Sequence, residues 1–220
     1  MFSKSMTAGA LALLAAPIIV IVGTLAQPTL SDDAASQVVA LTGHRGAMIT
    51  GMALSSIAVA LLIAGVIWLA LALSPRAPRL ALAGGVLGVF GLLLVLFENG
   101  VAAAGPAIVG GLDRIQATFV LDRIHSAAAI TALGPLSVIG DVGLVLLGIA
   151  AVKAGAPRWA GAAIVAGALG EGAGFATGTK ALVITAFAVL FVGLLQAVRT
   201  LTASPSPRPA TAGAKAAALS

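Results

Sequence analysis

Long uninterrupted apolar blocks, separated by short polar segments, make up most of this chain. Six blocks are long enough to cross a membrane as helices, because about 20 apolar residues span ~30 Å of hydrocarbon. Transmembrane strands would instead alternate apolar and polar positions over segments of about 10 residues, a pattern that these blocks lack. The sequence therefore predicts an all-α fold, a six-helix transmembrane bundle over residues 1–198. The predicted spans are about 7–26, 46–73, 80–97, 126–152, 158–175 and 180–198.

The composition supports a membrane setting. Hydrophobic residues make up 60% of the 220 residues and charged residues only 9%, whereas roughly 25% of residues are charged in soluble domains. A surface that faces water cannot be built from so few charges, so the lipid bilayer is the predicted surrounding. The chain contains no cysteine, which excludes disulfides, thiolate metal sites and cysteine nucleophiles. The net charge is +5, but the basic residues are scattered singly, so no nucleic-acid partner is expected.

The loop charges predict how the bundle is oriented. The side of a membrane protein with more Lys and Arg in its short loops is the cytoplasmic side. Eight basic residues fall on the side of the two termini and four on the other side, so both termini are predicted to be cytoplasmic. The eight are Lys4, Arg76, Arg79, Lys153, Arg158, Arg199, Arg208 and Lys215, and the four are Arg45, Arg114, Arg123 and Lys180.

Both ends of the chain need separate interpretation. The first span resembles a secretory signal, because Lys4 precedes an apolar run and residues 24–26 imitate a cleavage site. Its apolar run of about 19 residues exceeds the usual 7–15 of a signal, which favours a retained anchor. Cleavage would leave five helices and an N-terminus outside. Residues 199–220 are rich in Ser, Pro and Ala and are predicted to be a disordered cytoplasmic tail.

The outer segment between the third and fourth spans is long enough to hold structure of its own. Its sequence predicts a short amphipathic helix on the outer membrane interface, in which Leu112, Ile115 and Phe119 face lipid or protein.

Three features resemble an uncharacterised family of bacterial multi-helix membrane proteins, a domain of unknown function. They are Lys153 with the Pro-Arg-Trp turn at 157–159, the small-residue helix after that turn, and the Phe-Glu pair at 97–98. The resemblance covers mainly the second half of the chain. It implies a multi-pass topology in a bacterial cytoplasmic membrane and no particular activity.

Asp141 is the most informative polar residue, because it lies inside a predicted span. It is 16 residues after His125 and 12 before Lys153, so it sits ~24 Å from the outer end of the helix and ~18 Å from the inner end. An ionised carboxylate there costs at least ~2.5–3.5 kcal/mol, and no Lys or Arg lies inside a span to pair with it. We therefore expect Asp141 to be protonated, or to face a polar cavity or a bound cation.

The helix around Asp141 is predicted to be irregular. Pro135 lacks an amide donor and clashes with the carbonyl of Thr131, which predicts a kink. Broken helices beside an acid are common at the sites of transporters, so Asp141, Ser137, Pro135 and Thr131 are the candidate site for a proton, ion or polar solute. The alternative is that protonated Asp141 hydrogen-bonds a neighbouring helix and stabilises packing.

A second set of polar residues falls at the outer ends of the spans. Two histidines with carboxylates could ligate zinc, and two histidines alone could ligate one haem. The two histidines are single residues on different spans with no metal-binding spacing, which favours a solvated rim, and no cofactor or metal is predicted. The set is His44, Arg45, Glu98, Asn99, Asp122, His125 and Glu171.

Three functions remain open. The first is a small carrier or sensor that binds a proton, cation or polar solute at Asp141. The second is a noncatalytic membrane subunit or regulator that packs against a partner membrane protein or a second copy of the chain. The third, and least favoured, is a metal- or haem-bearing membrane enzyme built on the outer His and carboxylate residues, whose spacing is not a metal-binding motif. The chain has no Walker loop, nucleophile elbow or kinase signature to indicate phosphate or acyl chemistry.

Overall fold

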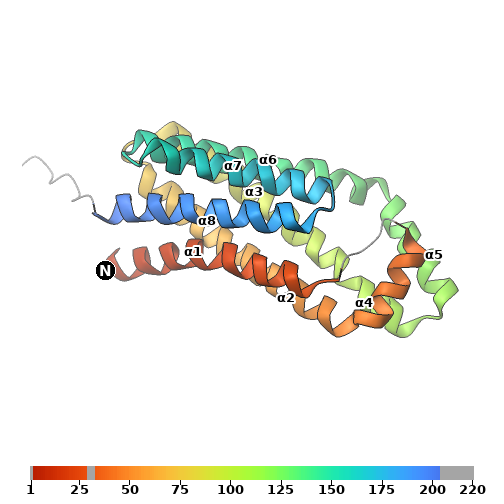
Figure 1. Ribbon diagram of the computed structural model, residues 1–220. Helices are drawn as coiled ribbons and strands as arrows, with labels where there is room; N and C mark the ends of the chain where they lie inside the picture. Colours follow the sequence, from red (N-terminus) through yellow and green to blue (C-terminus); the bar gives the residue numbers. More distant parts are fainter. Residues whose placement is uncertain (1, 29–32, 204–220) are drawn as a thin grey trace, which may run out of the picture.

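The computed structural model describes the backbone of residues 2–28 and 33–203, and their side chains from residue 8 onward except at positions 129 and 131. The predicted tail from residue 204 onward and the side chains of Lys4, Arg208 and Lys215 lie outside the described residues. All elements within the described ranges are helices (Figure 1). They are α1 (Phe2–Ala26), α2 (Ala34–Leu73), α3 (Pro78–Ala102), α4 (Ala104–Gly111), α5 (Arg114–Ser126), α6 (Ala128–Lys153), α7 (Arg158–Ala176) and α8 (Lys180–Ala203).

The six long helices pack in a closed cyclic order, in which each contacts the next along the chain and α8 returns to α1. Lys180 at the start of α8 donates a hydrogen bond to the carbonyl of Gln27, just after α1, which joins the first helix to the last. The start of α1 and the end of α8 lie at one end of the bundle, here called the termini end (Figure 1). Helices α4 and α5 lie at the opposite end, here called the cap end.

Five helical segments are long and apolar enough to cross a membrane: Ala8–Ala26, Ala34–Leu73, Pro78–Gly111, Ala132–Lys153 and Lys180–Ala203. Their length and hydropathy are those of a multi-pass membrane protein. Helix α7 packs between α6 and α8 as part of the same bundle. It is not one of the five, because its many glycines and Glu171 lower its hydropathy.

Helix α2 begins 12 residues earlier than the predicted span, at Ala34 instead of residue 46. Asp33 caps its first turn by accepting a hydrogen bond of 2.8 Å from the Ser36 amide. The hydrogen bonds from Ser36, its side chain first, hold the pKa of Asp33 below its usual value. His44 interrupts the helix with non-helical angles, φ −129° and ψ 28°. Helix α6 continues as one helix through Pro135, which a proline kink also allows, so the predicted kink stays a prediction.

The predicted amphipathic helix is α5, preceded by the shorter α4. Asp113 begins α5 by accepting a hydrogen bond of 2.9 Å from the Gln116 amide. One face of α5 is buried, with Ala117 and Leu121 packed against residues of α2 in a small separate core. The opposite face leaves Ile115 83% exposed and Phe119 59% exposed. A short helix is therefore present where one was predicted, and its contact with lipid or protein through Ile115 and Phe119 stays a prediction.

Helices α3 and α6 approach until their backbones touch. A Cβ atom added to Gly91 would lie 2.2 Å from the amide nitrogen of Gly140, and one added to Gly143 would lie 2.2 Å from that of Gly88. No carbon atom fits at such distances, so the crossing requires glycine at these positions. Small residues are common where membrane helices pack closely, because dispersion contacts between backbones replace the hydrophobic effect that lipid does not supply.

We predict that Gly91→Ala destabilises the bundle, because the methyl group would meet backbone atoms that can move only if the helices separate. The expected loss is about 1–3 kcal/mol, typical of overpacking. The matched control is Gly100→Ala in the same helix, since a Cβ added to Gly100 would meet nothing within 4 Å. Unfolding of both variants in mild detergent measures the difference. Equal stability of the two variants would contradict the tight crossing.

Candidate functional site

Asp141 lies beside a second carboxyl group, that of Glu171. Helices α6 and α7 form an antiparallel hairpin whose turn contains Gly155, with φ of 105°. Asp141 lies 15 residues before Ala156 and Glu171 lies 15 residues after it. Both residues are therefore about the same distance from the turn and meet at the same height in the bundle.

The Asp141 carboxyl group lies directly against the backbone of α7. A Cβ added to Gly172 would be 2.6 Å from Oδ2 of Asp141, so this glycine leaves the space that the carboxyl group occupies. The two carboxyl groups are close enough to interact electrostatically, and both residues are partly buried. Within the part of the chain that the structure describes, neither forms a hydrogen bond or an ion pair.

This arrangement has a definite chemical consequence. Two carboxylates without cationic partners repel each other, and apolar surroundings increase the cost of each charge. The pair is stabilised when it shares a proton or holds a cation, and its two groups then titrate as one coupled unit. The Asp141–Glu171 pair can therefore bind one small positive species.

The structure does not join the other predicted residues of α6 to Asp141. The Ser137 hydroxyl donates to the carbonyl of Gly134 in its own helix, over 2.7 Å. Pro135 is exposed on the side of the helix. The side chain of Thr131 lies outside the described residues. Among the residues predicted for this site, Asp141 is the one that the structure places beside a second functional group.

The residues predicted to form one outer cluster lie apart. Glu171 is at the Asp141 site instead of the rim. The Asn99 side-chain amide donates to the Ser55 hydroxyl over 3.1 Å and joins α3 to α2. The Arg45 guanidinium covers Gly110 of α4, where an added Cβ would lie 2.5 Å from Cζ. His44 is exposed at the kink of α2.

Three further members of that set lie at two separate places. Asp122 borders an open hollow of about 650 Å³ that Asp33 and Arg114 also line. Glu98 and His125 both line a smaller cavity of about 170 Å³ between the bundle and the cap end. Among the described residues, no group of three or more His, Cys, Asp or Glu side chains is placed to hold a metal ion.

We predict that a hydrophobic carbodiimide, which attacks protonated carboxyl groups in apolar surroundings, modifies Asp141 or Glu171 in the folded protein at neutral pH. A shared proton leaves one of the two groups reactive. Peptide mass mapping locates the adduct, and the double variant Asp141→Asn, Glu171→Gln should lose it. Exposed Asp113 serves as the control that reacts with a water-soluble carbodiimide instead. An unmodified Asp141–Glu171 pair would argue against the shared proton.

The comparisons with known proteins add no further identification of this arrangement. No protein-family model, no curated protein and no solved structure matches the chain. The resemblance to an uncharacterised membrane family therefore stays a prediction.

Proposed function

We propose that the protein is a small carrier or sensor of the cytoplasmic membrane that binds a proton or small cation at the Asp141–Glu171 pair. The observation that carries this proposal is the convergence of two carboxyl groups, neither with a cationic partner, on facing helices. Gly172 leaves room for the Asp141 carboxyl group, so the carboxyl group packs against α7 without displacing that helix.

The proposal includes a six-span topology, in which α7 crosses the membrane with the five more apolar helices. Helix α7 packs against both α6 and α8, so neighbouring helices shield its polar Glu171 from lipid. Its 19 residues are enough for about 28 Å of helix, close to the thickness of the hydrocarbon layer.

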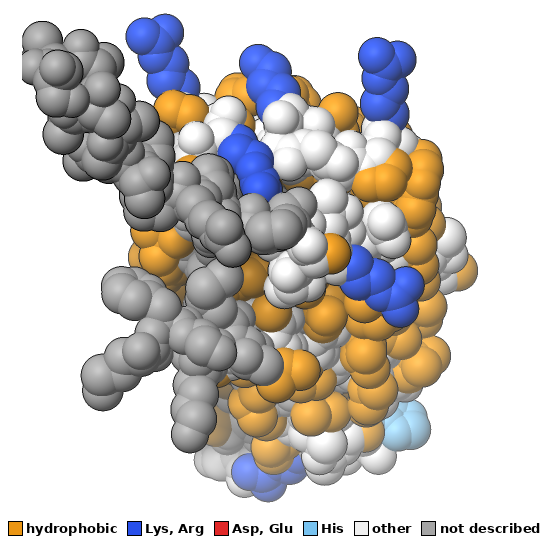
Figure 2. Space-filling view, turned by 90° about the vertical axis from the view of Figure 1, so that its left-hand side faces the viewer, with side chains coloured by type: hydrophobic (Ala, Val, Ile, Leu, Met, Phe, Trp, Pro, Cys, Tyr) orange, Lys and Arg blue, Asp and Glu red, His pale blue; other side chains and the backbone are white. Residues whose placement is uncertain are grey.

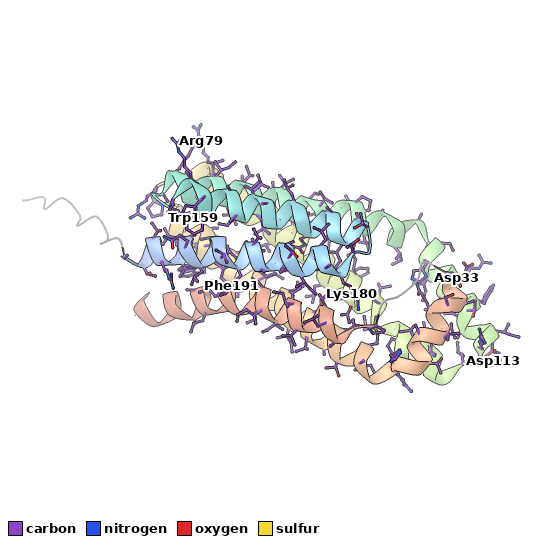
Figure 3. The ribbon with its side chains drawn as sticks, in the orientation of Figure 1. Asp33, Arg79, Asp113, Trp159, Lys180 and Phe191 are labelled. Carbon is purple, nitrogen blue, oxygen red and sulfur yellow. The ribbon has the colours of Figure 1, made fainter. Side chains whose placement is uncertain are left out.

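The charge distribution supports placing both termini in the cytoplasm. The basic residues at the termini end lie in the α2–α3 turn, the α6–α7 turn and the end of α8. Figure 2 views this end and shows Lys and Arg side chains, and no Asp or Glu side chain is visible on the part of the face that the grey atoms leave uncovered. Figure 3 shows Arg79 and Trp159 at the termini end and Asp33 and Asp113 near the cap end. Such a bias is what the positive-inside rule requires of a cytoplasmic side.

A carrier and a sensor use the same site differently. The bound proton or cation removes a repulsion between two carboxylates, so the empty pair favours a structure in which Asp141 and Glu171 are farther apart or more hydrated. Binding therefore shifts the population between two arrangements of the α6–α7 hairpin, by as much as the affinities of the two arrangements differ. A carrier would release the ion on the opposite side, whereas a sensor would transmit the change.

The second candidate function is a noncatalytic subunit or regulator. It is supported by an apolar groove of about 490 Å³ on the surface between α2 and α3, lined by residues such as Ile67, Leu82 and Phe90. A partner helix or a second copy could pack there, and so could lipid. The metal- or haem-bearing enzyme has the least support, because Glu98 and His125 share a cavity with no third ligand of their kind.

We predict that Asp141→Asn and Glu171→Gln each reduce ion-coupled activity by about tenfold or more, because each removes half of the site. Proteoliposomes with a trapped pH indicator, under an imposed proton or cation gradient, measure transport. Fluorescence of Trp159, at the start of α7, measures a pH-dependent rearrangement in a sensor. Gly172→Ala should weaken either signal too, since its methyl group displaces the Asp141 carboxyl group.

Exposed Asp122 supplies the matched control, because Asp122→Asn removes a carboxyl group at the cap end and should change neither signal. Both the carrier hypothesis and the sensor hypothesis would be contradicted if the Asp141 and Glu171 variants behaved like the unchanged protein in transport and in fluorescence.

We predict that labelling of single engineered cysteines reports the six-span topology. The chain has no cysteine of its own that would also be labelled. A membrane-impermeant maleimide applied to intact cells should label Gln116→Cys in α5 and Thr177→Cys in the α7–α8 turn. It should reach Ser74→Cys in the α2–α3 turn only after the cells are permeabilised. Because Thr177 follows α7, protection of Thr177→Cys with labelling of Gln116→Cys would mean that α7 does not cross.

A further inference from the structure

A small enclosed cavity lies where the cap end meets the six-helix bundle. Its walls come from five helices, α2, α3, α4, α5 and α6, and its volume is about 170 Å³. Ligand pockets for drug-sized molecules hold about 300–1,000 Å³, so this cavity suits a small molecule. Most of the wall is apolar, with Leu41 and Met48 from α2, Leu121 from α5 and Leu133 from α6.

Glu98 is the carboxyl group in this apolar wall. Its Oε1 atom is buried and accepts no hydrogen bond from the part of the chain that the structure describes. A buried acceptor without a partner costs about 1–3 kcal/mol, and more when the group is charged. No Lys or Arg is among the residues that line the cavity, and His125 is the one lining side chain that can carry a positive charge.

We infer that this cavity binds a small organic cation, an ammonium group on a short apolar body, with Glu98 as its counter-ion. The ammonium group would pair with the Glu98 carboxyl group, and the body would lie against the Leu and Met side chains. An anion would be repelled by Glu98. A bare metal ion would find too few ligands, because the walls are apolar and one carboxyl group and one imidazole face the space.

The cavity is separate from the Asp141–Glu171 pair. Glu98 lies seven residues beyond Gly91 along α3, ~10 Å toward the cap end. Gly91 contacts Gly140, the neighbour of Asp141. Binding in the cavity therefore goes beyond the proposed function and does not require the deeper pair to bind anything.

The test compares ligands of one size and different charge on the full-length protein in mild detergent. The ligands are n-butylammonium, n-butanol and butyrate, and saturation-transfer NMR measures their binding. We expect n-butylammonium to bind and the other two to bind at least about tenfold more weakly, because charge-assisted hydrogen bonds are worth more than about one power of ten in affinity. Glu98→Gln should weaken n-butylammonium by at least about tenfold as well.

Three further variants keep the test decisive. Leu133→Phe should abolish binding by filling the cavity while Glu98 is intact. Asp122→Asn, which removes an exposed carboxyl group at the cap end, should leave binding unchanged. Glu171→Gln should also leave it unchanged, which separates this site from the deeper pair. The inference is overturned if n-butylammonium fails to bind, if n-butanol binds as tightly, or if the Glu98→Gln and Leu133→Phe variants, still folded, bind it unchanged.

Discussion

Two helix backbones touch where α3 crosses α6, at Gly91 with Gly140 and at Gly88 with Gly143. This crossing is the most extensive contact between the first three long helices and the last three, and α8 closes the ring against α1. It also orients α6. Because Gly140 and Gly143 face α3, the intervening Asp141 is rotated by about 100° per residue away from them, and its carboxyl group reaches α7. The position of the acid thus depends on a contact made by its neighbours.

The sequence predicted those helices that lie in long apolar blocks, because a segment surrounded by lipid must pair its own backbone groups and therefore forms a helix. Apolar length alone located α3 and α6 to within about five residues, because a helix that crosses hydrocarbon must be apolar throughout. The first turns of α2 were missed for the complementary reason. Residues 34–45 lie beyond the long apolar block, carry polar side chains and form their helix by capping at Asp33 and by packing against α5. The cap is polar, and the apolar residues of this segment that pack in the small core, such as Val38 and Leu41, are too few to extend the long apolar block.

The candidate site was half visible in the sequence. Asp141 was apparent because an acid inside an apolar span is rare and costly. Glu171 was assigned to the rim because it lies near the outer end of its predicted span. Its distance from Ala156 along the chain equals that of Asp141, however, and this places the two residues together. That spacing was present in the sequence. The outer cluster could not be predicted, because nearness to a helix end does not say which way a side chain points. The Ser137 hydroxyl was equally misleading, since Ser readily donates to a carbonyl in its own helix.

Among the described residues, three carboxyl groups lie within the long helices, and their different surroundings are the reason why we propose different partners for them. Asp141 and Glu171 are two acids at one place, and the Asp141 carboxyl group fills the space beside Gly172, so the proposed occupant of the pair is a proton or a bare ion. Glu98 is single and faces a cavity with apolar walls, so a bare ion there would gain one counter-ion and lose its hydration. A cation that brings its own apolar surface loses much less on entering. The size and polarity of the space around each acid, more than the charge they share, therefore decide which cation each one favours.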